Sequence, residues 1–272
     1  MTHPPILGAA LTLDTYEMNR ELMRELPRDV EIQDFINADL LNSGAADAIA
    51  RSKTVLDGHE GRIGIHGPFW GFALDTVDPD VRTIVKKRLK QALDICAAIR
   101  ATHMVVHSPF STWDFNNLDN YERGKERKIE LCHLSMGEAV KQAEDIGCML
   151  VIENIEDKDP NDRLKLADSF QSPSVGLSVD TGHAHYAHGS TGAPPVDYFV
   201  KLAGNRLHHV HLQDADGYAD RHWSLGEGTI NWPSVFAALT AATSNPRLII
   251  ELRDHSQIRQ SIDAMKALGL AQ

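Results

Sequence analysis

The sequence lacks any apolar run of the roughly 18 residues that a membrane-spanning helix needs. It starts with MTHPPILGAA, which has no basic region followed by an apolar stretch, so we expect no secretory signal. Its three cysteines, Cys96, Cys132 and Cys148, have no CxxC spacing and lie in apolar segments, which predicts reduced core residues. These absences favour a cytoplasmic protein without membrane partners.

Positive charge is also scarce, with 27 Lys and Arg residues against 38 Asp and Glu residues and a net charge of −11. Proteins that grip nucleic acid backbones gain much of their affinity from Lys and Arg. The charge balance therefore disfavours a nucleic acid partner, although bound divalent cations supply positive charge where they sit. What the chain has in excess is histidine, at 14 of 272 residues.

Short apolar or β-branched segments alternate with stretches of helical spacing along the whole chain, and we find no linker or low-complexity tract. This alternation predicts an α/β protein, a single (β/α)8 TIM-barrel domain over residues 1–272. The alternative is an open doubly wound sheet, which needs a Gly-rich loop after its first strand; GAALTLDTYEMN contains none. The eight strand candidates cover residues 6–11, 30–36, 62–67, 103–108, 148–154, 175–181, 207–213 and 247–253.

The clearest helix signals lie at 78–101, where Asp78 and Pro79 form a typical start, and at 120–147, where Gly147 is a typical stop. A further helix is expected to open at Asn231-Trp232-Pro233. The first of these helices carries an apolar stripe that we expect to face the core. The stripe consists of Val81, Ile84, Val85, Leu89, Ala92, Leu93 and Cys96.

Ionisable residues occur near the carboxyl ends of the last six predicted strands. In a barrel these ends meet at one face, where active sites are built. Several buried charges there need compensation, and a divalent metal is the simplest one, because imidazole and carboxylate bind Zn, Mn, Fe or Co. The residues are His66, His107, Glu153, Asp180 with His183, His211 and Glu251.

Seven motifs in this order resemble the xylose isomerase-like barrel superfamily, which includes endonuclease IV and sugar isomerases and epimerases. They are IHGPF, VVHSPF, VIENIED, SVDTGHAH, HVHLQD, DRHWSLGEG and IIELRD, between residues 62 and 254. The resemblance is specific for the superfamily and much less specific for the reaction.

The resemblance to the epimerase-like members implies one divalent metal held by Glu153, Asp180, His211 and Glu251. In those enzymes the metal polarises the substrate carbonyl and stabilises an enediolate. Glu153 and Glu251 would then move a proton between substrate carbons, and His183 would hold a substrate hydroxyl. This interpretation implies an isomerase or epimerase of carbohydrate metabolism that acts on a sugar or sugar phosphate.

The chain also matches by type all nine ligands of the three zinc ions of endonuclease IV. By this resemblance His66, His107 and Glu153 hold one ion, the four residues above hold another, and His183, Asp220 and His222 hold a third. Such a site grips phosphate and activates water. We expect one bound ion, with sites for up to three. A phosphate group on the substrate would contact His66, His107, His183 or His222, directly or through a metal.

Asp220 and His222 belong to the loop DGYADRHWSLGEG, residues 216–228, and stand two apart, so in an extended segment both project to one face. There they would bind a metal or a substrate oxygen beside His183. Gly226 and Gly228 are expected to permit a tight turn, with Glu227 anchoring the loop rather than acting in catalysis.

Three features disfavour DNA as substrate. The segment NADLLNSGAAD (37–47), expected as a loop, lacks basic and bulky residues; the mouth holds few cations; and the net charge is −11. Aromatic residues near the mouth suit a small sugar-like ligand instead. The expected cations are Arg123, Lys125, Lys158 and Arg221, and the expected pocket wall is Phe69, Trp70, Trp113 and Trp223.

The sequence thus favours a metal-dependent isomerase or epimerase, with an endonuclease IV-like phosphoesterase as the alternative. A non-catalytic metal- or sugar-binding barrel is a third hypothesis, disfavoured because both glutamates and all ligand types are present. The resemblance also implies a homo-oligomer, since the epimerase-like enzymes often associate near the mouth.

Overall fold

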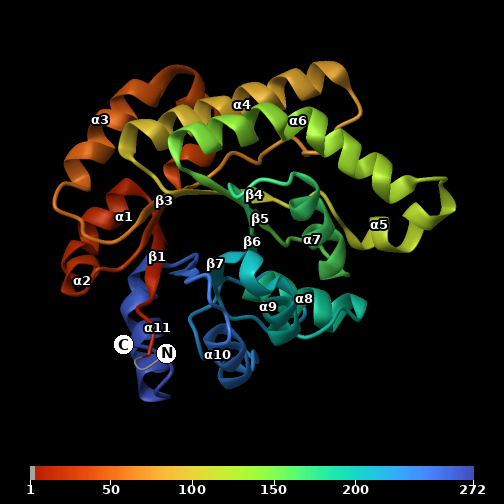
Figure 1. Ribbon diagram of the computed structural model, residues 1–272. Coiled ribbons are helices and arrows are strands. Elements are labelled where there is room, and N and C mark those ends of the chain that lie inside the picture. The colour runs from red at the N-terminus through yellow and green to blue at the C-terminus, as the bar shows by residue number, and fades with distance from the viewer. Residues whose placement is uncertain (1–3) are drawn as a thin grey trace.

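A computed structural model describes residues 4–272 and contains a closed barrel of eight parallel strands in chain order (Figure 1). Each predicted strand segment contains one of them. The prediction over 30–36 runs past its strand, because residues 34–36 turn into a short 3-10 helix. The strands are β1 Gly8–Leu11, β2 Val30–Ile32, β3 Ile63–His66, β4 His103–His107, β5 Met149–Glu153, β6 Val175–Asp180, β7 Leu207–Leu212 and β8 Arg247–Ile250.

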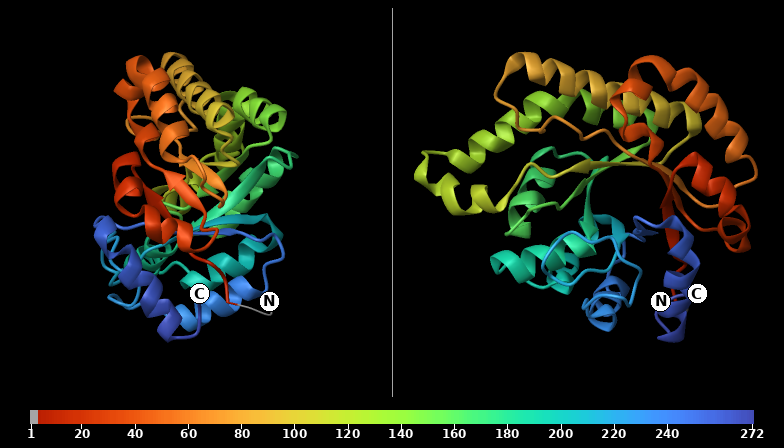
Figure 2. Two further views of the ribbon diagram at one scale, coloured as in Figure 1. Left: turned by 90° about the vertical axis from the view of Figure 1, so that its left-hand side faces the viewer. Right: turned by 180° about the vertical axis from the view of Figure 1, so that it is seen from behind.

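Helices connect successive strands and surround the barrel, as Figure 1 and the two turned views of Figure 2 show. The TIM-barrel prediction is therefore confirmed. The α-helices are α1 Leu13–Met18, α2 Arg20–Glu25, α3 Ala45–Val55, α4 Pro79–Ile99, α5 Thr112–Asn117, α6 Gly124–Ile146, α7 Pro160–Ser169, α8 Thr181–Thr191, α9 Val196–Ala203, α10 Trp232–Thr240 and α11 Ile258–Ala267. The short 3-10 and π elements are η1 Asp34–Ile36, η2 Leu40–Gly44, η3 Leu118–Asn120, η4 Gly204–Arg206 and η5 His255–Gln257.

The predicted helix ends are confirmed at their capping residues. The Asp78 side chain accepts from the amides of Asp80 and Val81 at the start of α4, with Pro79 in the first turn. Gly147 ends α6 with a left-handed backbone at φ 67°, which glycine adopts without a steric penalty. Helix α10 begins at Trp232, after Asn231.

Two local predictions are wrong. Ile84 is 50% exposed, because a residue five positions before Leu89 is rotated about 140° from it around a helix and leaves the core stripe. The segment 37–47 is mostly not a loop: η2 is one turn of π-helix and runs directly into α3. Its Leu41 side chain is buried, which fixes this turn against the barrel.

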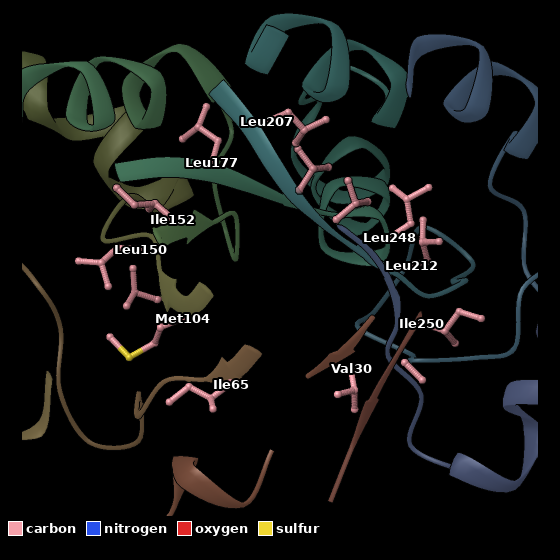
Figure 3. Packing of buried hydrophobic residues seen from close by; sticks show 14 of the residues in the cluster. Val30, Ile65, Met104, Leu150, Ile152, Leu177, Leu207, Leu212, Leu248 and Ile250 are labelled. Atoms are coloured by element: carbon pink, nitrogen blue, oxygen red, sulfur yellow. The ribbon is translucent and has the colours of Figure 1, made fainter. Parts of the chain in front are cut away.

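The hydrophobic core lies between the strands and the surrounding helices. Figure 3 shows buried side chains such as Ile65, Met104 and Ile152, contributed by neighbouring strands. Since side chains alternate along a strand, the residues between them point into the barrel. Many of these inward residues are polar, and they build the site. The three cysteines are free and buried, as predicted.

The first and last described segments lie side by side next to the barrel, where the Gln272 amide donates to the carbonyl of Pro5 at 3.1 Å (Figures 1 and 2). Helix α5, which follows β4, lies far from both ends (Figure 1). Among residues 4–272, no helix has the length and apolar character required to cross a membrane.

Candidate metal centre

Four potential ligands from consecutive strands converge inside the carboxyl end of the barrel. Glu153 ends β5, Asp180 ends β6, His211 is on β7 and Glu251 follows β8, and all four are buried. One ligand atom of each lies within 4.8 Å of the others. His211 Nδ1 contacts Glu153 Oε1 directly and lies 3.5 Å from Glu251 Oε2. We call these four residues the central cluster; their three carboxylates and one imidazole match the donor preferences of a divalent cation.

Asp180 is held so that one carboxylate oxygen faces this cluster without a protein donor. Its backbone exchanges two hydrogen bonds of 3.0 Å with the side-chain amide of Asn154. Its Oδ1 accepts from the amide of His183 at 2.7 Å and from Gln213 Nε2 at 3.2 Å. Its buried Oδ2 has no hydrogen-bond partner among residues 4–272, which is costly unless a cation or a proton satisfies it.

Burial, together with the charges of Glu153 and Glu251, raises the pKa of Asp180 to about 6, against the opposing effect of His183. Burial would also raise the pKa of Glu153, but the neighbouring imidazole of His211 lowers it below the usual range. Burial would lower the pKa of His211, whereas Glu251 and Glu153 raise it well above its usual value. The central cluster therefore retains a proton at neutral pH when no cation is present.

A first outer cluster consists of His66, His107 and Glu153. The Nε2 atoms of the two histidines lie 3.8 and 3.6 Å from Glu153 Oε2 and 3.4 Å from each other. His66 Nδ1 lies 2.8 Å from the carbonyl of Gly67, so it carries the hydrogen and leaves the Nε2 lone pair for a ligand. Burial, with a smaller effect of the neighbouring His66, lowers the pKa of His107 to about 3, which keeps its imidazole neutral.

A second outer cluster consists of His183, Asp220 and His222. Asp220 Oδ1 lies 3.5 Å from His183 Nε2 and 3.1 Å from His222 Nε2. The Nδ1 atoms of these histidines donate to the carbonyls of Asn154 and Glu251 at 3.0 and 3.2 Å, so both Nε2 atoms face the carboxylate. Burial would lower the pKa of His222, but Asp220 and Glu251 raise it to about 9. The structure thus brings together all nine sequence-derived ligand candidates.

The loop that carries Asp220 and His222 is fixed from within. Asp214 is fully buried and accepts hydrogen bonds from the amides of Ala215, Gly226 and Ile230 and from Trp232 Nε1, at 2.8 to 3.3 Å. Gly226 has a left-handed backbone at φ 91°.

Two further side chains complete this loop. Gln213 Oε1 accepts from the amide of His222 at 2.8 Å, while its Nε2 donates to Asp220 at 3.0 Å. Glu227 accepts from the amide of Ser224 at 3.2 Å, which confirms its predicted role as a loop anchor.

The four aromatic residues predicted as a pocket wall occupy different surroundings. Phe69 stacks on His107 with ring centroids 4.0 Å apart, beside a cavity of about 210 Å³ that Phe72 and Phe110 also line. Trp70 and Trp113 are 69% and 58% exposed. Trp223 pairs with Arg221, whose guanidinium lies 5.2 Å from its ring centre. Of the four, Phe69 is the one that contacts a ligand candidate directly.

The cations near the mouth are already engaged by the protein. Arg123 pairs with Glu130 at 2.7 Å, Lys125 with Asp162 at 2.8 Å and Arg221 with Asp216 at 2.8 Å. The fourth, Lys158, lies 4.6 Å from the centre of the Phe115 ring. Their charges are therefore less available to phosphates than the sequence alone suggested.

The sequence did not reveal four polar residues that contact the ligand candidates: Glu31, Gln33, Asn154 and Gln213. Glu31 Oε1 lies 2.9 Å from His211 Nε2, and Gln33 Nε2 donates to Glu251 Oε1 at 2.6 Å. The available signal was a polar residue inside an apolar strand motif, as in VEIQDF, VIEN and HLQD.

Comparison with known families gives a match over residues 29–268 to the model described as xylose isomerase-like TIM barrel. An uncharacterised protein of Methanocaldococcus jannaschii is 25% identical over 225 residues, covering 78% of this chain and 70% of its own length. The fructoselysine 3-epimerase of Escherichia coli O157:H7 is 33% identical over 100 residues, which is 35% of this chain and 34% of that enzyme.

Solved structures share the whole fold at low sequence identity. A D-tagatose 3-epimerase-like protein superposes with a TM-score of 0.74 at 21% identity, covering 97% of this chain and 95% of that one. A Thermus thermophilus protein from crystals soaked with zinc chloride gives a TM-score of 0.72 at 23% identity, covering 96% of this chain and 97% of that one.

Proposed function

Since the chain belongs to the xylose isomerase-like TIM-barrel family, we propose that it is a divalent-metal-dependent isomerase or epimerase of a sugar or sugar phosphate. The observation that carries the proposal is the central cluster, in which Glu153 and Glu251 both approach Nδ1 of His211. The local similarity to fructoselysine 3-epimerase supports the same reaction class.

We propose that Glu153, Asp180, His211 and Glu251 hold one divalent ion, with Mn, Zn, Co and Fe as candidates. Two observations fit such an ion: the buried Asp180 Oδ2 has no hydrogen-bond partner among residues 4–272, and the donors are one imidazole and three carboxylates. A bound ion supplies Lewis-acid polarisation of a substrate carbonyl, which acidifies the neighbouring C–H bond.

The proton transfer itself is assigned to the two glutamates. One carboxylate removes the proton from the carbon beside the carbonyl, and the other delivers a proton to the opposite face. Gln33 fixes Glu251 through Oε1, which leaves Oε2 directed to the cluster. His183, which is held by the carbonyl of Asn154, is placed to bind a substrate hydroxyl through Nε2.

The test measures hydrogen exchange at the substrate carbon in deuterated water with added Mn²⁺. The candidate substrates are D-tagatose, fructoselysine and phosphorylated ketoses, and NMR detects the incorporated deuterium. We expect exchange with one of these classes and its loss in Glu251→Gln and Glu153→Gln. Glu138→Gln, which changes an exposed residue of α6, is the matched control and should retain full exchange. Undiminished exchange in Glu251→Gln would remove that residue as acid or base.

The second candidate function is an endonuclease IV-like phosphoesterase, favoured by the two outer clusters that lie beside the central cluster. Metal content after purification without chelator or added metal discriminates the two. About one equivalent per chain supports the isomerase, whereas nearly three, with zinc among them, contradicts it. Cleavage of an abasic-site duplex that is lost in Glu153→Gln would establish the phosphoesterase.

A non-catalytic metal- or sugar-binding barrel is the remaining outcome. It would give tight, saturable binding of metal or sugar without exchange in any substrate class. The engaged cations at the mouth argue against a duplex ligand, because few free positive charges remain to neutralise phosphates.

A further inference from the structure

A second polar layer lies inside the barrel, below the central cluster, and its centre is the carboxylate of Glu31. This residue is on β2 and is completely buried. Its Oε1 faces His211 Nε2 at 2.9 Å, and its Oε2 lies 3.0 Å from His209 Nε2 and 3.4 Å from His103 Nε2. One carboxylate therefore meets three imidazoles from strands on other parts of the barrel wall.

The contact with His211 decides which ring nitrogen can act as a ligand. Nε2 is occupied by Glu31, so it must carry a hydrogen to make a favourable contact with a carboxylate. Nδ1 then presents its lone pair to the side where Glu153 and Glu251 lie. We propose that Glu31 is a positioning residue that fixes the tautomer and ring orientation of His211 so that Nδ1 binds the metal.

This inference rests on the metal centre of the proposed function and explains why a charge is buried here. An isolated buried carboxylate is strongly unfavourable, and apolar residues of similar volume usually fill such a space at least as well. A carboxylate that hydrogen-bonds a metal-bound histidine makes that ligand more basic and holds its ring plane. A charged Glu31 can therefore hold the His211 ring and raise its basicity, which a leucine or methionine at this position cannot do.

The layer is built to hold Glu31 in place. His209 Nδ1 lies 2.8 Å from Ser178 Oγ, which fixes this imidazole on the far side of the carboxylate. Gly64 is the register partner of both Glu31 and His103. A Cβ atom at Gly64 would come within 1.9 Å of the His103 ring, so glycine makes the room that this imidazole occupies.

The test uses Glu31→Gln, which keeps the shape of the side chain and removes its charge. Titration of the folded, metal-free protein with Mn²⁺ is expected to show an affinity about 10- to 100-fold lower than in the wild type. Asp162→Asn is the matched control, because it removes a buried carboxylate whose partner is Lys125. Its Mn²⁺ affinity should equal that of the wild type.

A second measurement uses the unaltered protein and needs no variant to fold. In the Zn²⁺-loaded wild type, nitrogen-15 NMR of the His211 imidazole should show a protonated Nε2 and a metal-bound Nδ1. A metal-bound Nε2 would overturn the proposal, as would Mn²⁺ affinity in Glu31→Gln within twofold of wild type. Loss of one whole metal equivalent in this variant, with the others unchanged, would make Glu31 itself a ligand and also overturn it.

These readouts involve no substrate. A protein that shows the expected tautomer and affinity loss but no sugar exchange would contradict the proposed function alone. A wild-type protein that exchanges sugar protons, with Mn²⁺ affinity in Glu31→Gln within twofold of wild type, would contradict the positioning role alone.

Discussion

Gln33 and Glu251 are 218 residues apart in sequence, yet Gln33 Nε2 donates a 2.6 Å hydrogen bond to Glu251 Oε1 inside the barrel mouth. The two residues follow β2 and β8, which are separated by β1 alone in the closed barrel. Closure of the barrel therefore creates this contact, and it fixes the orientation of one proposed proton-transfer group.

Replacing Gln33 by Leu should slow substrate proton exchange about 10- to 100-fold, because a hydrogen bond to a charged group contributes about 1.5–3 kcal/mol. The variant removes the donor to Glu251 Oε1, so the carboxylate of Glu251 is no longer held in one orientation. The rate of deuterium incorporation measures the effect. Gln142→Leu, which removes an exposed amide bonded to Asp94, should leave the rate unchanged. Equal rates in both variants would mean that Gln33 does not orient Glu251.

The sequence pointed to most of the ligand candidates because they repeat the same local signal, an ionisable group near the end of an apolar strand. His66, Asp180 and His211 could thus be placed at one face without knowing any contact. Gln33 and Glu31 do not show this signal, because what marks them is their contacts with Glu251 and His211, which are 218 and 180 residues away in sequence. Which polar residues meet inside a barrel depends on strand register, and the sequence pattern does not specify it.

The exposure of individual apolar side chains was also predicted incompletely from the sequence. The apolar stripe predicted for α4 includes Ile84 beside Val85 and Leu89, although its angular position on the helix points it to solvent. The exposure of Trp70 likewise depends on a loop conformation, and that of Trp113 on the placement of the short helix α5, neither of which residue type determines. The fold and the convergence of the ligand candidates were therefore predictable, whereas the supporting hydrogen bonds and the surroundings of the aromatic residues were not.

Gly64→Ala should strongly destabilise the fold. The added Cβ would lie 1.9 Å from the His103 ring, which is fully buried and cannot move away freely. Overpacking of this kind costs about 1–3 kcal/mol or more, which urea unfolding will measure. Gly137→Ala is the matched control: its Cβ would meet nothing within 4 Å, and in the middle of α6 alanine should stabilise by about 0.5–1 kcal/mol. Similar stability of the two variants would contradict the tight packing around His103.

Asp214→Ala should lower the free energy of unfolding by more than about 3 kcal/mol, because it leaves four donors without an acceptor, three of them buried, at about 1–3 kcal/mol for each buried donor. Asp216→Ala, in the same loop, loses a partly exposed pair with Arg221 and should cost less than about 1 kcal/mol. Urea unfolding of both proteins provides the comparison. A small loss for Asp214→Ala would show that water replaces its carboxylate.

Metal affinity should fall as the pH falls below about 9. The pKa of His222 is raised to about 9, and the pKa values of His183 and His211 are also raised, so all three hold protons at pH 7 in the metal-free protein. Metal binding requires the deprotonated imidazole, and an ion must displace these protons. Below pH 6 the carboxyl of Asp180, whose pKa is raised to about 6, adds a further proton to be displaced.

Calorimetric titration with Zn²⁺ at pH 7, in buffers of different ionisation enthalpy, measures the number of protons released. We expect at least one proton for an ion in the central cluster, from His211. His222→Gln removes one of the two titrating histidines of the second outer cluster and serves as the comparison. If wild type releases more protons than His222→Gln, the ion also engages that cluster; equal release confines it to the central cluster. Release of no proton by the wild type would contradict His211 as a ligand that is protonated before binding.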